Sequence, residues 1–322
     1  MNRRNFNVLA AALAAGFGAL PAAASSWPSK PITLVVPYAP GGTADALARV
    51  LAQHLGTRLK VSVVVLNKAG ASGVIGAASV AQAQPDGYTV LYDATPLSIN
   101  PHLQKLPFDA DKDLQPVALV GVTPMLVVVP KNSPYNTLQE LIAAAAKEPG
   151  KLTFGSGGQG TVQYMGAELF NQGVGIKMLH VPYRAGGLAL QAILAGEVDM
   201  GFFNLPALSS HIKGGALKPL AITSAKRNSL FPNVPTIGEA GVKGYEVYEW
   251  NGMFVPSATP AEIVARLNAA VREVLAMPEV KARFDALGSE IVGSQPDEFR
   301  RRLAAESARW AETIKAAGIK KE

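Results

Sequence analysis

Short apolar runs alternate along the chain with longer segments whose apolar positions fall on one helical face. In the first such unit, the β-branched run at 32–36 predicts a buried strand. Pro37 and Pro40 end it, because neither residue can donate to a sheet ladder. A glycine turn at 41–42 follows, and Thr43 is predicted to be the N-cap of a helix. The apolar positions of that helix share one face: Ala44, Leu47, Ala48, Leu51 and Leu55.

This stretch joins a strand, a glycine turn and a helix N-terminus, so several unpaired backbone N–H groups point at one place. Such a place suits a carboxylate or a phosphate. An ordinary connection between a strand and a helix has the same pattern, so the stretch alone leaves both interpretations open.

The alternation continues and predicts an α/β fold with a mostly parallel sheet. A second glycine-rich turn at 67–76 and the segment 93–96 each follow a further strand, so a ligand is expected outside the carboxyl ends of these strands. From residue 152 the alternation starts again, which predicts a second, smaller α/β unit. The predicted strands are 61–66, 88–92, 117–122, 126–129, 152–154, 177–181, 198–203 and 217–223, with an extended run at 244–255. The predicted helices are 77–83, 138–147 with a capping box at Thr137 and Glu140, one starting at 161, 188–194, 260–276, 278–287 and 297–317.

The first 24 residues have the pattern of a secretory signal peptide. Arg3 and Arg4 precede an apolar run at 8–20, and alanines at 22–24 form a small-residue cleavage site. We therefore expect a mature protein that starts near Ser25 and is exported to the periplasm, with the choice between the Sec and twin-arginine routes undecided. The chain has no cysteine, so its stability comes from the core and not from disulfides.

The basic residues are dispersed and argue against nucleic acid as a partner. The net charge of +6 falls to +4 when Arg3 and Arg4 are removed. Adjacent basic residues occur at 300–302 and 320–321, and no aromatic side chains interleave them. A mild positive balance suits a small organic anion.

The sequence offers little for catalysis or for a cofactor. Four histidines without paired spacing, and no cysteine, argue against a metal site. No G-x-S-x-G elbow and no phosphate loop of the G-x-x-x-x-G-K-[ST] type occur. A G-x-G-x-x-G pattern at 155–160 follows a predicted strand, but the acidic residue that a dinucleotide site needs at the end of the next strand is missing. We therefore expect no catalytic residue, no metal and no cofactor.

The loop at 155–161 is instead predicted to be a second anion site or a flexible connection. Its glycines would leave N–H groups accessible, and Ser156 and Thr161 offer hydroxyls. Arg184 follows the next strand and either pairs with a carboxylate or is solvated. Asp199 and Asn204 flank an apolar strand. The Asp199 carboxylate either binds a ligand amine or fixes loop N–H groups, with the second role favoured. Asp45 has the same two possible roles, and the structural role is again favoured.

Several stretches together resemble a known family. They are WPSKPITLVVPYAPGGTAD, NKAGASGVIGAASVAQAQPDGYTVL, GSGGQGTVQYMGAELF, HVPYRAGG with GEVDMGF, and VPTIGEAG followed by WNGMFVPSATP. The chain is similar over its whole mature length to the extracytoplasmic solute receptors of tripartite tricarboxylate transporters, the Bug or TctC-type binding proteins.

The resemblance implies a two-lobed α/β fold like that of type II periplasmic binding proteins, with two crossing strands near 121–130 and 245–256 as the hinge. Its implied division is lobe I at 25–124 and 249–322, and lobe II at 125–248. The predicted ligand-binding residues are Tyr38, Gly42, Thr43, Asp45, Ser72, Gly73, Thr95, Ser156, Gly157, Gly158, Thr161, Arg184, Asp199 and Asn204.

The function that the resemblance implies is capture of a small organic anion by a monomeric receptor. The lobes would close over a mono-, di- or tricarboxylate, and integral membrane transporter subunits would read the closed shape. A receptor that feeds a sensor system, and an exported enzyme on the same scaffold, remain as alternatives.

Overall fold

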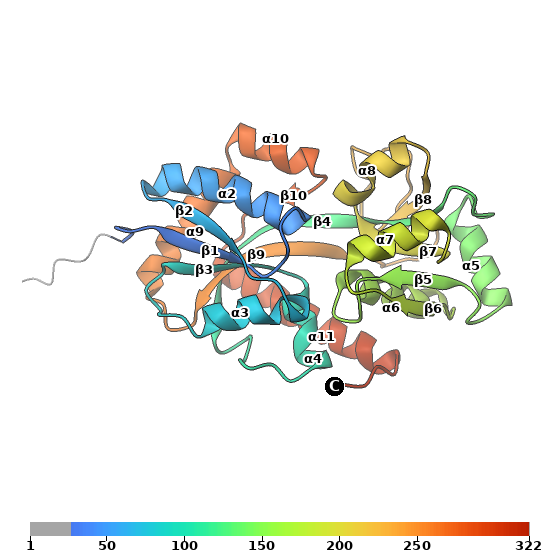
Figure 1. The fold of residues 1–322 in the computed structure, drawn as a ribbon, viewed down its shortest axis with the longest axis horizontal. Coiled ribbons are helices and arrows are strands. Elements are labelled where there is room, and N and C mark those ends of the chain that lie inside the picture. The colour runs from blue at the N-terminus through green and yellow to red at the C-terminus, as the bar shows by residue number, and fades with distance from the viewer. Residues whose placement is uncertain (1–26, 322) are drawn as a thin grey trace, which may run out of the picture.

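The computed structural model describes residues 27–321, and the predicted signal peptide lies outside this range. The described chain forms two halves that lie side by side, each a β-sheet with helices on both faces (Figure 1). We call them lobe I, which contains the strands β1 to β3, and lobe II, which contains β5 to β8. Two strands run from one half into the other.

The sheet of lobe I has the order β2-β1-β3-β9-β4. The first three strands are parallel, β9 runs antiparallel to β3, and a short strand β10 pairs with β4. Their carboxyl ends therefore meet at one edge, as the alternating pattern predicts. The strands are β1 (Ile32–Val36), β2 (Val63–Asn67), β3 (Thr89–Ala94), β4 (Leu114–Pro130), β9 (Tyr248–Pro256) and β10 (Glu290–Ile291).

Apolar positions on both faces of this sheet bury it between two layers of helices. Tyr92 and Met253 belong to the core under α2, α9 and α10, while Leu91 and Phe254 belong to the core under α3 and the start of α11. The helices of lobe I are α2 (Thr43–Leu59), α3 (Val74–Ala81), α4 (Pro96–Leu103), α9 (Ala261–Leu275), α10 (Pro278–Ala286) and α11 (Pro296–Ala316), with a 3₁₀ turn at Ala71–Gly73 before α3.

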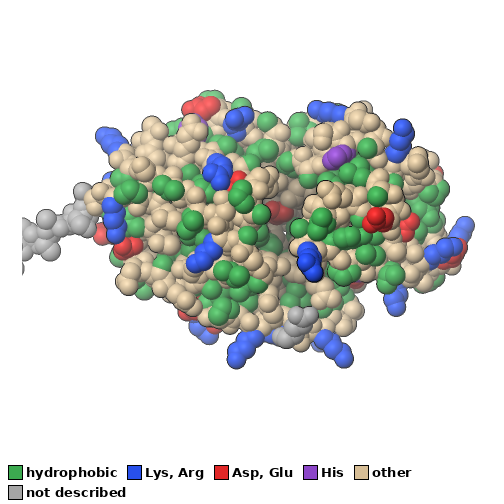
Figure 2. Space-filling model, in the orientation of Figure 1, with side chains coloured by type: hydrophobic (Ala, Val, Ile, Leu, Met, Phe, Trp, Pro, Cys, Tyr) green, Lys and Arg blue, Asp and Glu red, His purple; other side chains and the backbone are tan. Residues whose placement is uncertain are grey.

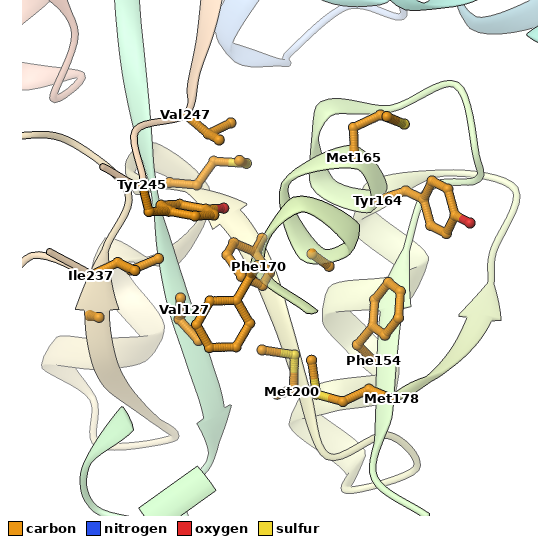
Figure 3. Packing of buried hydrophobic residues seen from close by; sticks show 14 of the residues in the cluster. Val127, Phe154, Tyr164, Met165, Phe170, Met178, Met200, Ile237, Tyr245 and Val247 are labelled. Atoms are coloured by element: carbon orange, nitrogen blue, oxygen red, sulfur yellow. The ribbon is translucent and has the colours of Figure 1, made fainter. Parts of the chain in front are cut away.

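Lobe II repeats the arrangement with the strand order β4-β7-β5-β6, and β8 also pairs with β4. Its larger core lies between the sheet and α6, where Phe154, Phe170 and Met200 pack together (Figure 3). The strands are β5 (Thr153–Ser156), β6 (Leu179–Pro182), β7 (Met200–Asn204) and β8 (Leu217–Ile222). The helices are α5 (Leu138–Lys147), α6 (Val162–Val174), α7 (Gly186–Ala195) and α8 (Leu205–Lys213).

The strand β4 changes partners in the middle of the molecule. From Leu114 to Pro124 it pairs with β9, and from Met125 onward it pairs with β7 and β8. Pro124 has no N–H to donate, so it fits the position where one ladder ends and the next begins. The sequence predicts two strands at 117–122 and 126–129, and the structure joins them into this single crossing strand.

The last helix contacts both lobes. Phe299 at its start is buried in the lobe I core, whereas Trp310 and Ile314 are buried in the lobe II core. The predicted division of the chain falls within β4 at 124/125 and at the start of β9 at 248/249, and it stays a prediction. The end of α11 packs between the lobes, because Trp310 and Ile314 lie in one cluster with residues of α6 in lobe II and with Ile99 and Leu103 of α4 in lobe I.

Two local predictions have different outcomes. The capping box at Thr137 and Glu140 is confirmed at the start of α5. The prediction that Thr43 caps α2 is wrong: the helix starts at Thr43, its N-cap is Gly42, and no side chain caps it. The sequence also missed α4 and α8, two short helices that follow β3 and β7 directly.

Candidate functional site

Six helices begin where a strand ends at the boundary between the lobes. They are α2, α3 and α4 from lobe I, and α6, α7 and α8 from lobe II. Five of them, all but α6, have no side-chain hydrogen bond at their N-cap. Their first N–H groups have no partner within the helix, and the helix dipoles add positive potential. The space between the lobes is therefore surrounded by groups that favour an anion.

The carboxylate of Asp45 is held inside its own loop. It accepts hydrogen bonds from the Gly41 N–H (2.9 Å), from Arg49 Nε (3.0 Å) and from Asn67 Nδ2 (2.8 Å). Burial opposes its ionisation, but the bonds from Arg49, Gly41 and Asn67 outweigh burial and lower its pKa. Asp45 thus fixes the turn before α2, and the partly exposed Thr43 stands at the tip of that helix.

Tyr38, Gly73 and a buried aspartate that the sequence analysis missed lie together at the ends of β1 and β3. The Tyr38 hydroxyl donates to Asp93 Oδ1 at 2.7 Å. A Cβ on Gly73 would stand 3.3 Å from the Tyr38 hydroxyl oxygen, so this turn passes close to the pair. Asp93 is 1% exposed, and burial raises its pKa to about 7 although Tyr38 and the Ala94 N–H hydrogen-bond to it.

The Thr95 side chain accepts a hydrogen bond from the crossing strand β9. Its Oγ1 accepts from the Trp250 N–H at 2.9 Å, which ties the start of α4 to β9. Thr95 is completely buried. Its hydroxyl hydrogen is free to point to a second acceptor, as a ligand contact requires.

Ser72 lies where lobe I approaches lobe II. A Cβ on Gly160 would be 3.1 Å from Ser72 Oγ and 2.9 Å from Asn100 Oδ1, so the two lobes are already in close contact here. Ala71 and Ser72 both have positive φ, a conformation that costs energy for residues other than glycine. A cavity of about 390 Å³ opens beside this contact, and it is lined from both lobes, by Ser72, Asn100, Gln104, Gln159, Gly160 and His180 among others.

The loop at 155–161 has fewer free backbone N–H groups for a ligand than the sequence predicts. The Gly157 N–H donates to Gln163 Oε1 (3.0 Å), and the Gly158 N–H donates to Ser156 Oγ (3.1 Å). The prediction that these glycines leave their N–H groups accessible is therefore wrong, because nearby side chains take them up. Ser156 is also bonded to His180 Nε2 at 2.7 Å, and burial lowers the pKa of His180 to about 4.

Thr161 is the N-cap of α6, and this role uses its hydroxyl. The hydroxyl donates to the Gly158 carbonyl at 2.7 Å and accepts from the Tyr164 N–H at 3.4 Å. It has no hydrogen left to donate to an anion while the first bond persists. In lobe II the free N–H groups at the start of α7 are better placed for an anion, since no side chain caps that helix.

The three remaining predicted site residues lie in different parts of lobe II. Arg184 is exposed just before α7. Asp199 lies before β7, at the edge of the sheet opposite the carboxyl ends, where its carboxylate accepts from the N–H and the hydroxyl of Thr153 at 2.7 and 2.8 Å. The prediction that Asp199 binds the ligand is therefore wrong, because this edge of the sheet faces away from the lobe boundary. Asn204 ends β7 at the lobe boundary and donates to Glu249 Oε2 at 2.6 Å.

Other parts of the described chain do not suggest a different centre. A larger cavity of about 680 Å³ lies between α2 and α10 on lobe I and contains none of the predicted site residues. Within residues 27–321, no three His, Cys, Asp or Glu side chains are grouped so as to hold a metal ion. None of the helices in this range is long and apolar enough to cross a membrane.

Comparisons with known proteins agree with this arrangement. A family model described as the tripartite tricarboxylate transporter family receptor matches residues 47–319. Protein BugT of Bordetella pertussis is 36% identical over 305 residues, which cover 94% of each chain.

Two solved structures are similar in both sequence and shape. The Rhodopseudomonas palustris protein Rpa4515, solved with adipate, has 35% identity and a TM-score of 0.84, with 92% of this chain and 100% of that chain covered. MatC from the same organism, solved with bound malate, has 32% identity and a TM-score of 0.79, with 89% and 100% covered. The predicted α/β, two-lobed binding-protein fold is confirmed.

Proposed function

This chain belongs to the tripartite tricarboxylate transporter receptor family, and on that premise we propose that it is a periplasmic receptor for a small organic anion. The lobes close over a carboxylate, and the closed form delivers it to the membrane subunits of a tripartite tricarboxylate-type transporter. No bond is made or broken in this cycle. The proposed mature protein starts near Ser25.

The observation that carries the proposal is the set of uncapped helix N-termini at the lobe boundary. The starts of α2, α3 and α4 on one side and of α7 and α8 on the other offer N–H groups that no side chain satisfies. A carboxylate between them would accept hydrogen bonds from both lobes. The two neighbours solved with adipate and with malate support a carboxylate as the ligand.

Closure follows from mass action. A ligand that contacts both lobes binds the closed form more tightly than the open form and shifts the population toward it. The strands β4 and β9 and the helix α11 connect the lobes and would bend during closure. The contact of Gly160 with Ser72 and Asn100 then belongs to the closed form.

Adding a matching carboxylate should stabilise and compact the protein. A ligand at 100 times its Kd raises the free energy of unfolding by about 2.7 kcal/mol. A thermal-shift screen with adipate, malate and related mono- and dicarboxylates checks the binding, and small-angle scattering with the best of them checks the compaction. If no acid shifts the melting temperature, the proposal of a carboxylate receptor is wrong. An unchanged radius at saturation contradicts lobe closure alone.

Thr43→Val should change ligand affinity, whereas Thr161→Val should change the stability of the free protein. Thr43 caps nothing, so Thr43→Val should leave the melting temperature of the free protein unchanged and weaken binding of the best carboxylate about tenfold, as expected for one lost hydrogen bond to a charged group. Thr161→Val should instead lower the free energy of unfolding by about 1 kcal/mol, because it removes a helix cap. Calorimetric titration and urea unfolding of both variants test this. Normal binding by Thr43→Val would place the ligand away from α2.

A further inference from the structure

A glutamate stands at the point where the two lobes meet. Glu249 is on β9, opposite Thr123 of the crossing strand β4, and the next residue, Trp250, donates its N–H to Thr95. Its Oε2 accepts from Asn204 at the end of β7 in lobe II. The carboxylate therefore lies between elements of both lobes, and acidic atoms are visible in the hollow between the two halves in Figure 2.

Asp93 provides a second carboxylate on the same boundary. Tyr38 links the two, because it hydrogen-bonds to Asp93 at 2.7 Å and because the charges of Asp93 and then of Glu249 add to burial in raising its pKa. Both acidic groups thus influence the Tyr38 hydroxyl, and Asp93 lies next to the uncapped starts of α3 and α4.

Neither carboxylate has a cationic partner in the part of the chain that the structure describes. The ion pairs within residues 27–321 involve other acidic residues. No lysine or arginine contributes to the pKa of Asp93 or of Glu249, and burial raises both values. Two buried carboxylates without a cation at the lobe boundary would repel a simple dianion bound there, whereas a positive group on the ligand would compensate their charge.

Nearby polar atoms are also without partners. The Tyr92 hydroxyl, Asn204 Oδ1 and both amide atoms of Asn251 are buried and make no hydrogen bond in the described part of the chain. Tyr92 and Asn251 are at most 1% exposed. Ala94 pairs with Asn251, so alternation along β3 and β9 puts Tyr92, Asn251 and Glu249 on one face of the sheet. Buried polar groups of this kind need a partner, which a ligand or its water shell would supply.

We propose that the ligand carries an ammonium group as well as a carboxylate, and that Glu249 receives the ammonium. This inference rests on the proposed function and narrows it from organic anions to zwitterionic amino acids. The helix N-termini hold the ligand carboxylate, while Glu249 forms the cation-binding part of the same site and the Asp93–Tyr38 pair lies at the end of the adjoining strand β3. Asn204 keeps the Glu249 carboxylate in place by its 2.6 Å hydrogen bond.

Titration calorimetry with matched acids tests the inference. The probes are succinate and aspartate, glutarate and glutamate, and adipate and 2-aminoadipate, which differ within each pair by the amino group. The amino member of at least one pair should bind at least tenfold more tightly than its parent acid. In Glu249→Gln, which still accepts from Asn204, that preference should fall about tenfold or more.

Glu246→Gln is the matched control, since Glu246 is an exposed glutamate three residues earlier, and it should keep the preference. Tighter binding of the unsubstituted acids, or a preference that survives in Glu249→Gln, overturns the inference and leaves the receptor function standing. The absence of binding for every carboxylate, including malate, overturns the receptor function and the inference together.

Discussion

Replacing Gly160 with leucine should weaken binding of the best carboxylate about 100-fold while the free protein stays folded. Even a Cβ at this position would come within 2.9 Å of Asn100 Oδ1 and 3.1 Å of Ser72 Oγ, both in lobe I. Such overpacking costs about 1–3 kcal/mol, and a branched side chain belongs at the upper end of that range. The cost falls on the closed form alone, because in an open form the side chain faces solvent. About 3 kcal/mol corresponds to about 100-fold in apparent affinity.

Calorimetric titration measures the loss, and small-angle scattering at saturating ligand should show that the variant no longer compacts. The control is Gly173→Ala in α6 of the same lobe, where a new Cβ makes an ordinary 3.5 Å contact with Val242. It should bind normally. Full affinity and full compaction in Gly160→Leu would mean that the contact between Gly160 and lobe I is not part of the ligand-bound form.

Local backbone chemistry explains which parts of the fold the sequence could predict. Proline ends β1 after Val36, and glycine opens the turn before α2, whatever the rest of the chain does. The same holds for the caps at Thr137 and Thr161, which depend on residues three positions away. The alternation of strands and helices therefore predicts the lobes and the edge at which a ligand would bind.

The helix α4 has no local sequence pattern that predicts it. The segment of α4 contains Pro101, and most of its residues are buried on several sides, polar ones included. Its apolar residues do not form one face, because Leu97 packs in one core cluster and Ile99 and Leu103 pack in another, so the pattern did not identify it. The helix forms because its contacts with α11 and with the 3₁₀ turn hold it there, and those contacts join distant parts of the chain.

The two acidic residues of the proposed ammonium site were missed for a similar reason. Asp93 depends on Tyr38, 55 positions away, and Glu249 on Asn204, 45 positions away. One aspartate at a strand end and one glutamate between aromatic residues are unremarkable in a sequence. Which N–H groups stay free also depends on side-chain positions, as the bond between Gly157 and Gln163 illustrates.

Asp93→Asn should make the unliganded protein more stable than wild type at neutral pH, by up to about 4 kcal/mol. The folded protein raises the pKa of Asp93 to about 7, against about 3.9 for an unfolded aspartate, and each pKa unit corresponds to about 1.4 kcal/mol. Between these two values the folded state holds a proton that the unfolded state has lost. The free energy of unfolding of wild type therefore falls as the pH rises through this window, and asparagine does not titrate.

Urea unfolding of both proteins from pH 4 to pH 8 tests this. The difference between the proteins should be small near pH 4, grow as the pH rises, and level off above pH 7. Glu306, whose pKa is also raised by burial to about 7, is present in both proteins and cancels in the difference. Asp45→Asn is the control of opposite sign. Hydrogen bonds lower the pKa of Asp45, so this variant should be less stable than wild type at neutral pH, with a deficit that shrinks as the pH falls.

A constant difference between Asp93→Asn and wild type across this range would contradict a buried, unpaired carboxyl. The expected result bears on function, because a carboxylate that destabilises the free protein is relieved once a cation lies beside it. A saturating amino-acid ligand should therefore stabilise wild type more than Asp93→Asn at pH 8, where Asp93 is charged. Equal stabilisation of the two proteins would place the ammonium at Glu249 alone.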